Sequence, residues 1–225
     1  MGGPMHRSLR LISPAALALV AVAAFVAPSW SAEKGTFSIG GNFGTGIYSM
    51  SDLNDDLELL GYEEVSSGWE YGGSLRYQVS PRLALDLEVN LMKPKSTTED
   101  SPDPDIEVET PAMAIPLSLY YTLSENDQYR FNLFGGAGLL SGAKLEASQG
   151  SDDAETESAS SFYGHAGLEA QWMLSPQFSL GARVLGRTAK ATTESEDGLS
   201  EFDLDYTGVA FGLGARISFG GGGGE

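Results

Sequence analysis

The chain has 225 residues, with 31 acidic against 13 basic side chains, a formal net charge of −18 and no cysteine. The missing cysteines exclude disulfides, thiolate metal sites and thiol nucleophiles. The acidic balance argues against a nucleic-acid partner, because a phosphate backbone requires a basic surface.

Residues 1–31 have the composition of a secretory signal peptide. Arg7 and Arg10 precede an apolar run from Leu11 to Ala27, and the small residues Ser29 and Ser31 follow. This run is short for a spanning helix, which favours a cleaved signal over a membrane anchor. The rest of the chain suffices for one eight-stranded barrel, so we expect a single domain over residues 32–219, followed by a Gly-rich tail over 220–225.

Eight later segments carry apolar residues at every second position, the period of a β-strand. In chain order they cover residues 37–47, 69–79, 83–92, 113–121, 129–139, 162–172, 178–184 and 209–219. In the third, Leu83, Leu85, Leu87, Val89 and Leu91 share one face, while Ala84, Asp86, Glu88, Asn90 and Met92 share the other. Outside the N-terminus no segment has a convincing helical period, which predicts an all-β fold.

The connections and the aromatic residues favour a membrane barrel over a soluble sandwich, which would also alternate. Short turns near residues 80–82, 125–127 and 175–177 alternate with four long connections, the arrangement typical of outer-membrane barrels. Aromatic residues of the apolar face form two groups, as expected at two membrane interfaces. The larger lies near the short turns and the strand termini (Phe37, Tyr77, Tyr121, Tyr129, Phe131, Trp172, Phe178 and Phe219), the smaller near the long loops (Trp69, Tyr71 and Phe162). We therefore predict an eight-stranded antiparallel up-and-down transmembrane β-barrel preceded by a signal peptide.

Most of the acidic residues fall in the four long connections, so one end of the barrel should be strongly negative. Carboxylates there could bind divalent cations or cationic partners, or bridge to lipopolysaccharide. The spacing of Asp100, Asp103 and Asp105 lacks the glycine and terminal glutamate of an EF-hand, so we interpret these loops as a solvated acidic surface. Residues 149–161 have a disorder-prone composition.

The inward positions carry charges of both signs. They are Glu70, Arg76, Asp86, Glu88, Arg130, Lys144, His165, Glu169, Arg183, Arg187 and Arg216. The interior of an eight-stranded barrel is just wide enough to be filled by side chains, and buried charges must be paired, so we predict a salt-bridged plug. Arg76, Asp86, Glu169 and Arg183 should lie at similar depth and form the pairs. A narrow gated pore lined by the same residues is the alternative.

No catalytic, metal or cofactor site is predicted. His165 is the only histidine after the signal and shares its face with Glu169, as a general base held by a carboxylate would. No inward serine lies within two residues of it, and no second histidine could complete a metal site. Pro116 lies mid-strand and faces inward, where it lacks the N–H that a closed ladder needs, so we expect a bulge or a broken bond there.

The chain resembles the outer-membrane β-barrel family that includes the outer-membrane proteins A, W and X and the opacity proteins. The resemblance rests on residues 116–121 (PLSLYY), 134–138 (FGGAG) and the last strand, 209–219 (VAFGLGARISF), within an eight-strand frame. It implies a non-enzymatic protein of a Gram-negative-type outer membrane, exported through a cleaved signal peptide, in contact with lipid and lipopolysaccharide. Such proteins serve envelope integrity, adhesion or the passage of small solutes.

The resemblance leaves three functions open. We expect a monomeric structural or surface-interaction protein; a small solute pore is the first alternative and a lipid-modifying enzyme the second. The chain departs from the family where Gly220–Gly224 and Glu225 follow the terminal aromatic Phe219. We also expect no peptidoglycan-binding domain after the barrel.

Overall fold

The computed structural model describes residues 34–59, 64–96, 106–126, 128–149, 152–156, 158–194 and 201–220. The predicted signal peptide lies outside these residues, as does the tail beyond Gly220. No helix within these residues is long and apolar enough to cross a membrane.

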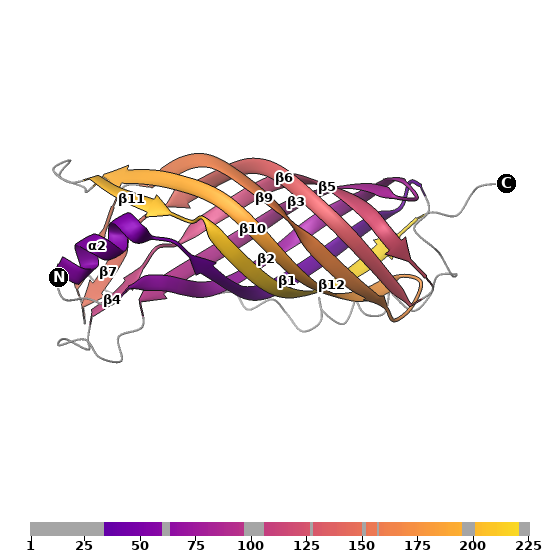
Figure 1. Cartoon of the computed structure of the whole chain (residues 1–225), viewed down its shortest axis with the longest axis horizontal. Helices are drawn as coiled ribbons and strands as arrows, with labels where there is room; N and C mark the ends of the chain where they lie inside the picture. Colours follow the sequence, from indigo (N-terminus) through magenta and orange to yellow (C-terminus); the bar gives the residue numbers. More distant parts are fainter. Residues whose placement is uncertain are drawn as a thin grey trace, which may run out of the picture.

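Eight antiparallel strands form a closed barrel (Figure 1). They are β1 (Phe37–Tyr48), β2 (Val65–Ser80), β3 (Leu83–Ser96), β5 (Ala112–Glu125), β6 (Tyr129–Ala143), β9 (Ala159–Met173), β10 (Phe178–Glu194) and β12 (Gly208–Phe219). Each strand pairs with its neighbour in the chain, and β1 closes the barrel by pairing with β12 from Phe37 opposite Phe219 to Tyr48 opposite Gly208. The predicted all-β barrel is confirmed, and its strands of 12 to 17 residues are long enough to span a tilted membrane wall.

The alternation in the sequence corresponds to the two faces of the wall. Along β3, Leu85, Leu87 and Leu91 are exposed on the outer surface, while Asp86 and Glu88 are buried. The outer surface therefore consists of a continuous apolar band that lipid can cover. The predicted aromatic residues follow the same parity, with Trp69 and Phe162 exposed towards the loop end and Tyr129 and Trp172 towards the short turns.

The loop end carries structure that the sequence pattern did not predict. A short helix, α2 (Ser51–Leu59), follows β1 and buries Leu53 and Leu57, so the expectation of no further helix is wrong. Three short strands, β4 (Ile106–Glu109), β7 (Glu146–Gln149) and β8 (Asp152–Glu155), extend the sheet from β3, and β11 (Glu201–Asp205) pairs with the end of β10. These elements gather at one end of the barrel, opposite the short turns (Figure 1).

The extension also corrects the expectation for residues 149–161. Despite its Ser- and acid-rich composition, this region contains strand β8 at residues 152–155. Strand β8 pairs with β7 in a hairpin, with Ala147 opposite Ala154. Backbone pairing to a preformed sheet edge supplies order that the composition of an isolated segment does not indicate.

The ladder is interrupted at Pro116, as predicted. Between β3 and β5 the pairs run to Leu87 opposite Leu117 and resume at Asn90 opposite Ala114 in the same register. The two pairs that would include Pro116 and Ile115 are missing, because proline has no N–H to donate. The unchanged register means a locally broken ladder rather than a bulge, and on its other side Pro116 remains opposite Gly138.

Candidate functional site: the barrel lumen

The inward parity of five strands brings four arginines and four carboxylates into the lumen. Strand β2 supplies Glu70 and Arg76, β3 supplies Asp86 and Glu88, β9 supplies Glu169, β10 supplies Arg183 and Arg187, and β12 supplies Arg216. Each of these eight side chains forms an ion pair, with the pairs distributed along the barrel axis. Pairing is required physically, because an isolated charge buried in the wall of a small barrel would be strongly disfavoured.

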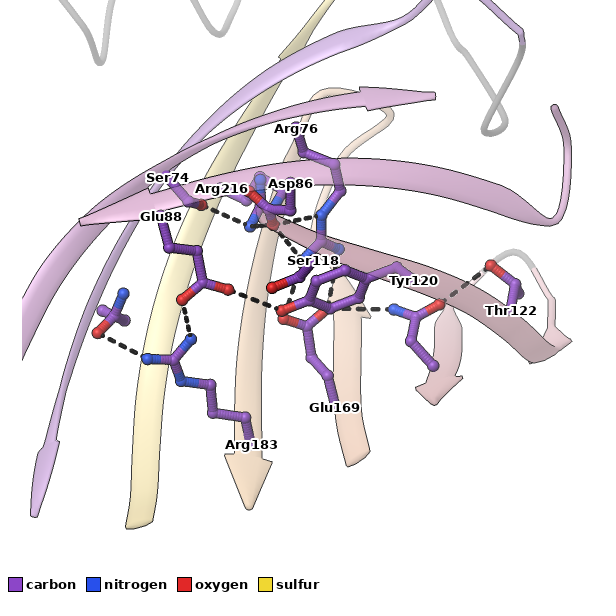
Figure 2. A network of polar contacts seen from close by, with 12 residues as sticks. Ser74, Arg76, Asp86, Glu88, Ser118, Tyr120, Thr122, Glu169, Arg183 and Arg216 are labelled. Carbon is purple, nitrogen blue, oxygen red and sulfur yellow. Dashed lines mark hydrogen bonds and ion pairs between the residues drawn. The ribbon is translucent and has the colours of Figure 1, made fainter. Parts of the chain in front are cut away.

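The first cluster is centred on Arg76 (Figure 2). Its Nε donates to Asp86 Oδ2 at 2.7 Å, and its Nη1 and Nη2 donate to the two oxygens of Glu169 at 3.0 and 3.3 Å. The Arg216 Nη2 atom shares Asp86 Oδ2 at 3.0 Å and also donates to Ser74 Oγ at 2.9 Å. Such charge-assisted, bidentate contacts hold the guanidinium in one orientation.

The second cluster joins β10 to β3 across the lumen. Arg183 Nη1 donates to Glu88 Oε2 at 2.8 Å, and Arg183 Nη2 donates to Asn42 Oδ1 at 3.1 Å. The other Glu88 oxygen accepts the Tyr120 hydroxyl at 3.1 Å. Tyr120 also lies under the Arg76 guanidinium, whose carbon is 3.6 Å from the ring centroid, so it connects the two clusters (Figure 2).

The third cluster lies nearer the loop end. Arg187 Nη1 is 2.5 Å from Glu70 Oε1, and the Tyr48 hydroxyl donates to the same oxygen at 2.8 Å. Arg187 Nε donates to the Tyr206 carbonyl at 3.0 Å, and its guanidinium lies over the Tyr48 ring. This cluster therefore ties the wall of the barrel to the segment that enters β12.

Two of the predicted inward charges lie apart from these clusters. Arg130, the second residue of β6, forms an ion pair with Glu125 of β5 at the short-turn end of the barrel. Lys144 follows the end of β6 and is 2.5 Å from Glu146 of β7. We expected Arg183 to form an ion pair within the set of Arg76, Asp86 and Glu169. It pairs with Glu88 instead.

His165 has a serine partner that sequence spacing missed. Its Nε2 lies 2.7 Å from the Ser118 Oγ, and its Nδ1 lies 3.4 Å from the Tyr163 hydroxyl. Ser118 is 47 residues away from His165 in the chain. The two side chains meet because β5 and β9 face the same lumen. Ser118 is 0% and His165 7% exposed, so a lipid outside the barrel does not reach this pair. Among the described residues, no group of three or more acidic or histidine side chains could hold a metal ion.

An apolar cluster fills the lumen at the loop end. It includes Met50, Leu53 and Leu57 around α2, Leu204 of β11 and Tyr206 just after it, and inward residues such as Met92 and Leu140. Its surroundings are polar: Asp205 Oδ2 is 3.0 Å from Lys190 Nζ, and its Oδ1 accepts the Thr207 N–H at 2.9 Å. Partial burial raises the pKa of Asp205, but the Thr207 hydrogen bonds and Lys190 outweigh it and hold the pKa below the ordinary aspartate value. We call this region the loop-end cap.

A small cavity of about 30 Å³ lies in the lumen between the first two clusters. Its lining includes Asn42, Ser74, Gln171, Ser179, Arg183 and Arg216. A volume of this size accommodates about one water molecule or one small ion.

Comparison with known proteins identifies the family of this barrel. A family model described as "Outer membrane protein beta-barrel domain" matches residues 15–219, which is most of the chain. The chain belongs to this family. The protein is therefore an outer-membrane β-barrel, as the sequence pattern predicted.

Several solved structures are similar to this chain. The crystal structure of Neisserial surface protein A superposes with a TM-score of 0.50 at 13% identity, covering 83% of this chain and 98% of that one. OprG from Pseudomonas aeruginosa matches with a TM-score of 0.49 at 12% identity, covering 83% and 97%. The outer membrane protein AlkL, solved in lipid bilayers, matches with a TM-score of 0.47 at 16% identity, covering 89% and 98%. A search of curated proteins found no match to this chain.

Proposed function

We propose that this outer-membrane barrel is a non-enzymatic, non-conducting protein whose acidic loops present an interaction surface outside the cell. The observation that carries the proposal is the filled lumen, with every one of the eight central charges paired and the loop-end cap above them. An open pore needs a continuous aqueous path, and a lumen of this diameter filled with ordered side chains leaves none.

The loops supply the surface of this proposed function. Helix α2 buries Leu53 and Leu57 against the cap and carries Asp52, Asp55, Asp56 and Glu58. On the sheet extension, Glu109 of β4 lies opposite Glu146 of β7, which forms an ion pair with Lys144. The acidic face of α2 favours divalent cations, or partners with cationic groups, over anionic ones. We expect the barrel to work as a monomer.

Planar-bilayer recording tests the closed lumen. The protein is purified, folded into detergent and inserted, with insertion checked by the heat-dependent shift of the folded band on a gel. We expect no regular current steps from the inserted protein. Regular steps of one size, seen only with the folded form, would contradict the proposal and establish a small pore instead.

The Ser118–His165 pair is the one arrangement that favours an enzyme, since a serine within hydrogen-bond reach of a histidine can act as a nucleophile and base. Two observations weigh against it: both side chains are buried in the lumen, and the second histidine nitrogen faces the Tyr163 hydroxyl rather than a carboxylate. We therefore assign the pair a packing role. Expression of the wild type and of His165→Ala should leave the mass of lipid A identical, and a mass change abolished by His165→Ala would identify a lipid-modifying enzyme.

A further inference from the structure

We propose that the lumen cavity beside Arg216 is a binding site for one small inorganic anion of chloride size. This site is distinct from the ion pairs that close the lumen, and its existence does not depend on whether the barrel conducts. The argument rests on which hydrogen-bonding groups around the cavity are already used and which remain available.

The groups that remain are mainly donors. Arg216 Nη1 is buried and has no partner within the described part of the chain. Arg216 and Arg183 both line the cavity, together with the hydroxyl groups of Ser74 and Ser179 and the amide of Gln171. Gln171 and Ser179 are themselves more than nine-tenths buried. A buried donor without a partner costs about 1–3 kcal/mol, so a ligand that accepts hydrogen bonds is favoured here.

The Glu169 carboxylate and the Asn42 oxygen in the lining of the cavity are already engaged. Glu169 is the only carboxylate in its lining, and its two oxygens accept from Arg76, with a further bond from Asn132. The Asn42 Oδ1 atom accepts from Arg183. Asp86 Oδ1 is the other buried atom without a partner near Arg216, but Asp86 does not line the cavity. The lining thus carries two guanidinium groups and one carboxylate, while Glu88 and Asp86, the ion-pair partners of Arg183 and Arg216, lie outside it.

A halide fits the cavity, because its free volume is about 30 Å³ and one water-sized group needs only about 10–15 Å³. Chloride makes contacts with several donors at once without requiring a directed acceptor geometry, which matches donors that come from four strands, β2, β9, β10 and β12.

Thermal unfolding at fixed ionic strength tests this inference. The detergent-folded protein is heated in sodium sulfate and in sodium chloride, with loss of β-structure followed by circular dichroism. A ligand at 100 times its dissociation constant should raise the midpoint by roughly 5–10 °C for a chain of this size. Sulfate stabilises compact proteins more strongly in general, so a gain in chloride over sulfate cannot be a general salt effect.

A pair of glycine variants on β10 locates the effect. Gly181 lines the cavity, and a Cβ there would meet Ala170 O at 3.5 Å and Gln171 Cγ at 3.8 Å, ordinary contacts that allow folding. Gly181→Ala should remove the chloride effect by filling the space. Gly186 on the same strand is exposed, and a Cβ there meets nothing within 4 Å, so Gly186→Ala should keep the full effect.

Crystals grown in sodium bromide provide a direct observation, because bromide scatters anomalously and water does not. We expect an anomalous peak beside Arg216 in the wild type and none in Gly181→Ala. A chloride midpoint no higher than the sulfate midpoint, or a bromide crystal without a peak in this cavity, would overturn the inference and leave the cavity to water.

Discussion

Arg183 and Glu169 lie directly opposite each other on β10 and β9, yet Arg183 forms its ion pair with Glu88 on the far side of the lumen, at 2.8 Å. Glu169 is instead held by Arg76 from β2. The two pairs cross the lumen and leave the cross-strand neighbours unpaired with each other. The network therefore ties distant strands together, so that losing one member affects the whole barrel.

Glu88→Ala should destabilise the barrel strongly. The carboxylate is 1% exposed and accepts from Arg183, Tyr120 and Asn90, so its removal leaves a buried guanidinium without its partner. Breaking a buried pair on one side costs about 3–5 kcal/mol. Urea unfolding of the detergent-folded protein, followed by the gel shift, measures the change.

The matched control is Glu125→Ala, because the Glu125 side chain is 31% exposed whereas that of Glu88 is 1% exposed. Solvent-exposed pairs contribute about 0–1 kcal/mol, so this variant should lose less stability than Glu88→Ala. Equal losses from the two variants would show that the lumen pairs contribute no more than surface pairs.

Gly46→Ala should also destabilise the protein, through steric overlap. A Cβ at this inward position would lie 2.1 Å from Glu70 Oε1 and 2.4 Å from Arg187 Nη2, so the third cluster would have to move. Overpacking of this kind costs about 1–3 kcal/mol. Gly186→Ala, with open space at its Cβ, serves as the control, and an equal unfolding midpoint for the two variants would contradict the described packing.

Leu57→Ala should loosen the loop-end cap, whereas Leu59→Ala should not. Leu57 is buried in the apolar cluster and Leu59 is 86% exposed two residues later on the same helix. Truncating a buried leucine costs about 2–5 kcal/mol, and truncating an exposed one very little. Limited proteolysis of the folded protein is the measurement: cleavage near α2 should accelerate only for Leu57→Ala, and equal cleavage of both variants would place α2 away from the cap.

The cap should weaken in acid through Asp205. Its pKa is lowered in the folded protein, so its contribution to stability is fully present above the ordinary aspartate pKa and is lost as pH falls through the lower folded value. Proteolysis of the β11 region should therefore accelerate below about pH 4 in the wild type. Asp205→Asn keeps the shape but not the charge, so its cleavage should vary less over this range. An identical acid response in this variant would assign the effect to other groups.

Local sequence was sufficient for the barrel wall. A period of two specifies which side chains face lipid and which face inward, because successive residues of a strand point to opposite faces. The parity of Leu85, Asp86, Leu87 and Glu88 was readable without any tertiary information, as was the break at Pro116, since a proline lacks the donor wherever its strand lies. The alternation of short turns and long loops then indicated which end of the barrel carries the loops.

Only the tertiary structure decided which inward residues meet. Ser118 and His165, Arg183 and Glu88, and Arg76 and Glu169 are 47, 95 and 93 residues apart, and each pair meets because a closed, sheared wall brings non-neighbouring strands to one depth. The same holds for the loop-end cap: α2 is too short to be stable alone and forms where Leu53 and Leu57 can be buried under β11. Strand period is a local property of the chain, whereas lumen contacts depend on barrel closure and on side chains long enough to cross it.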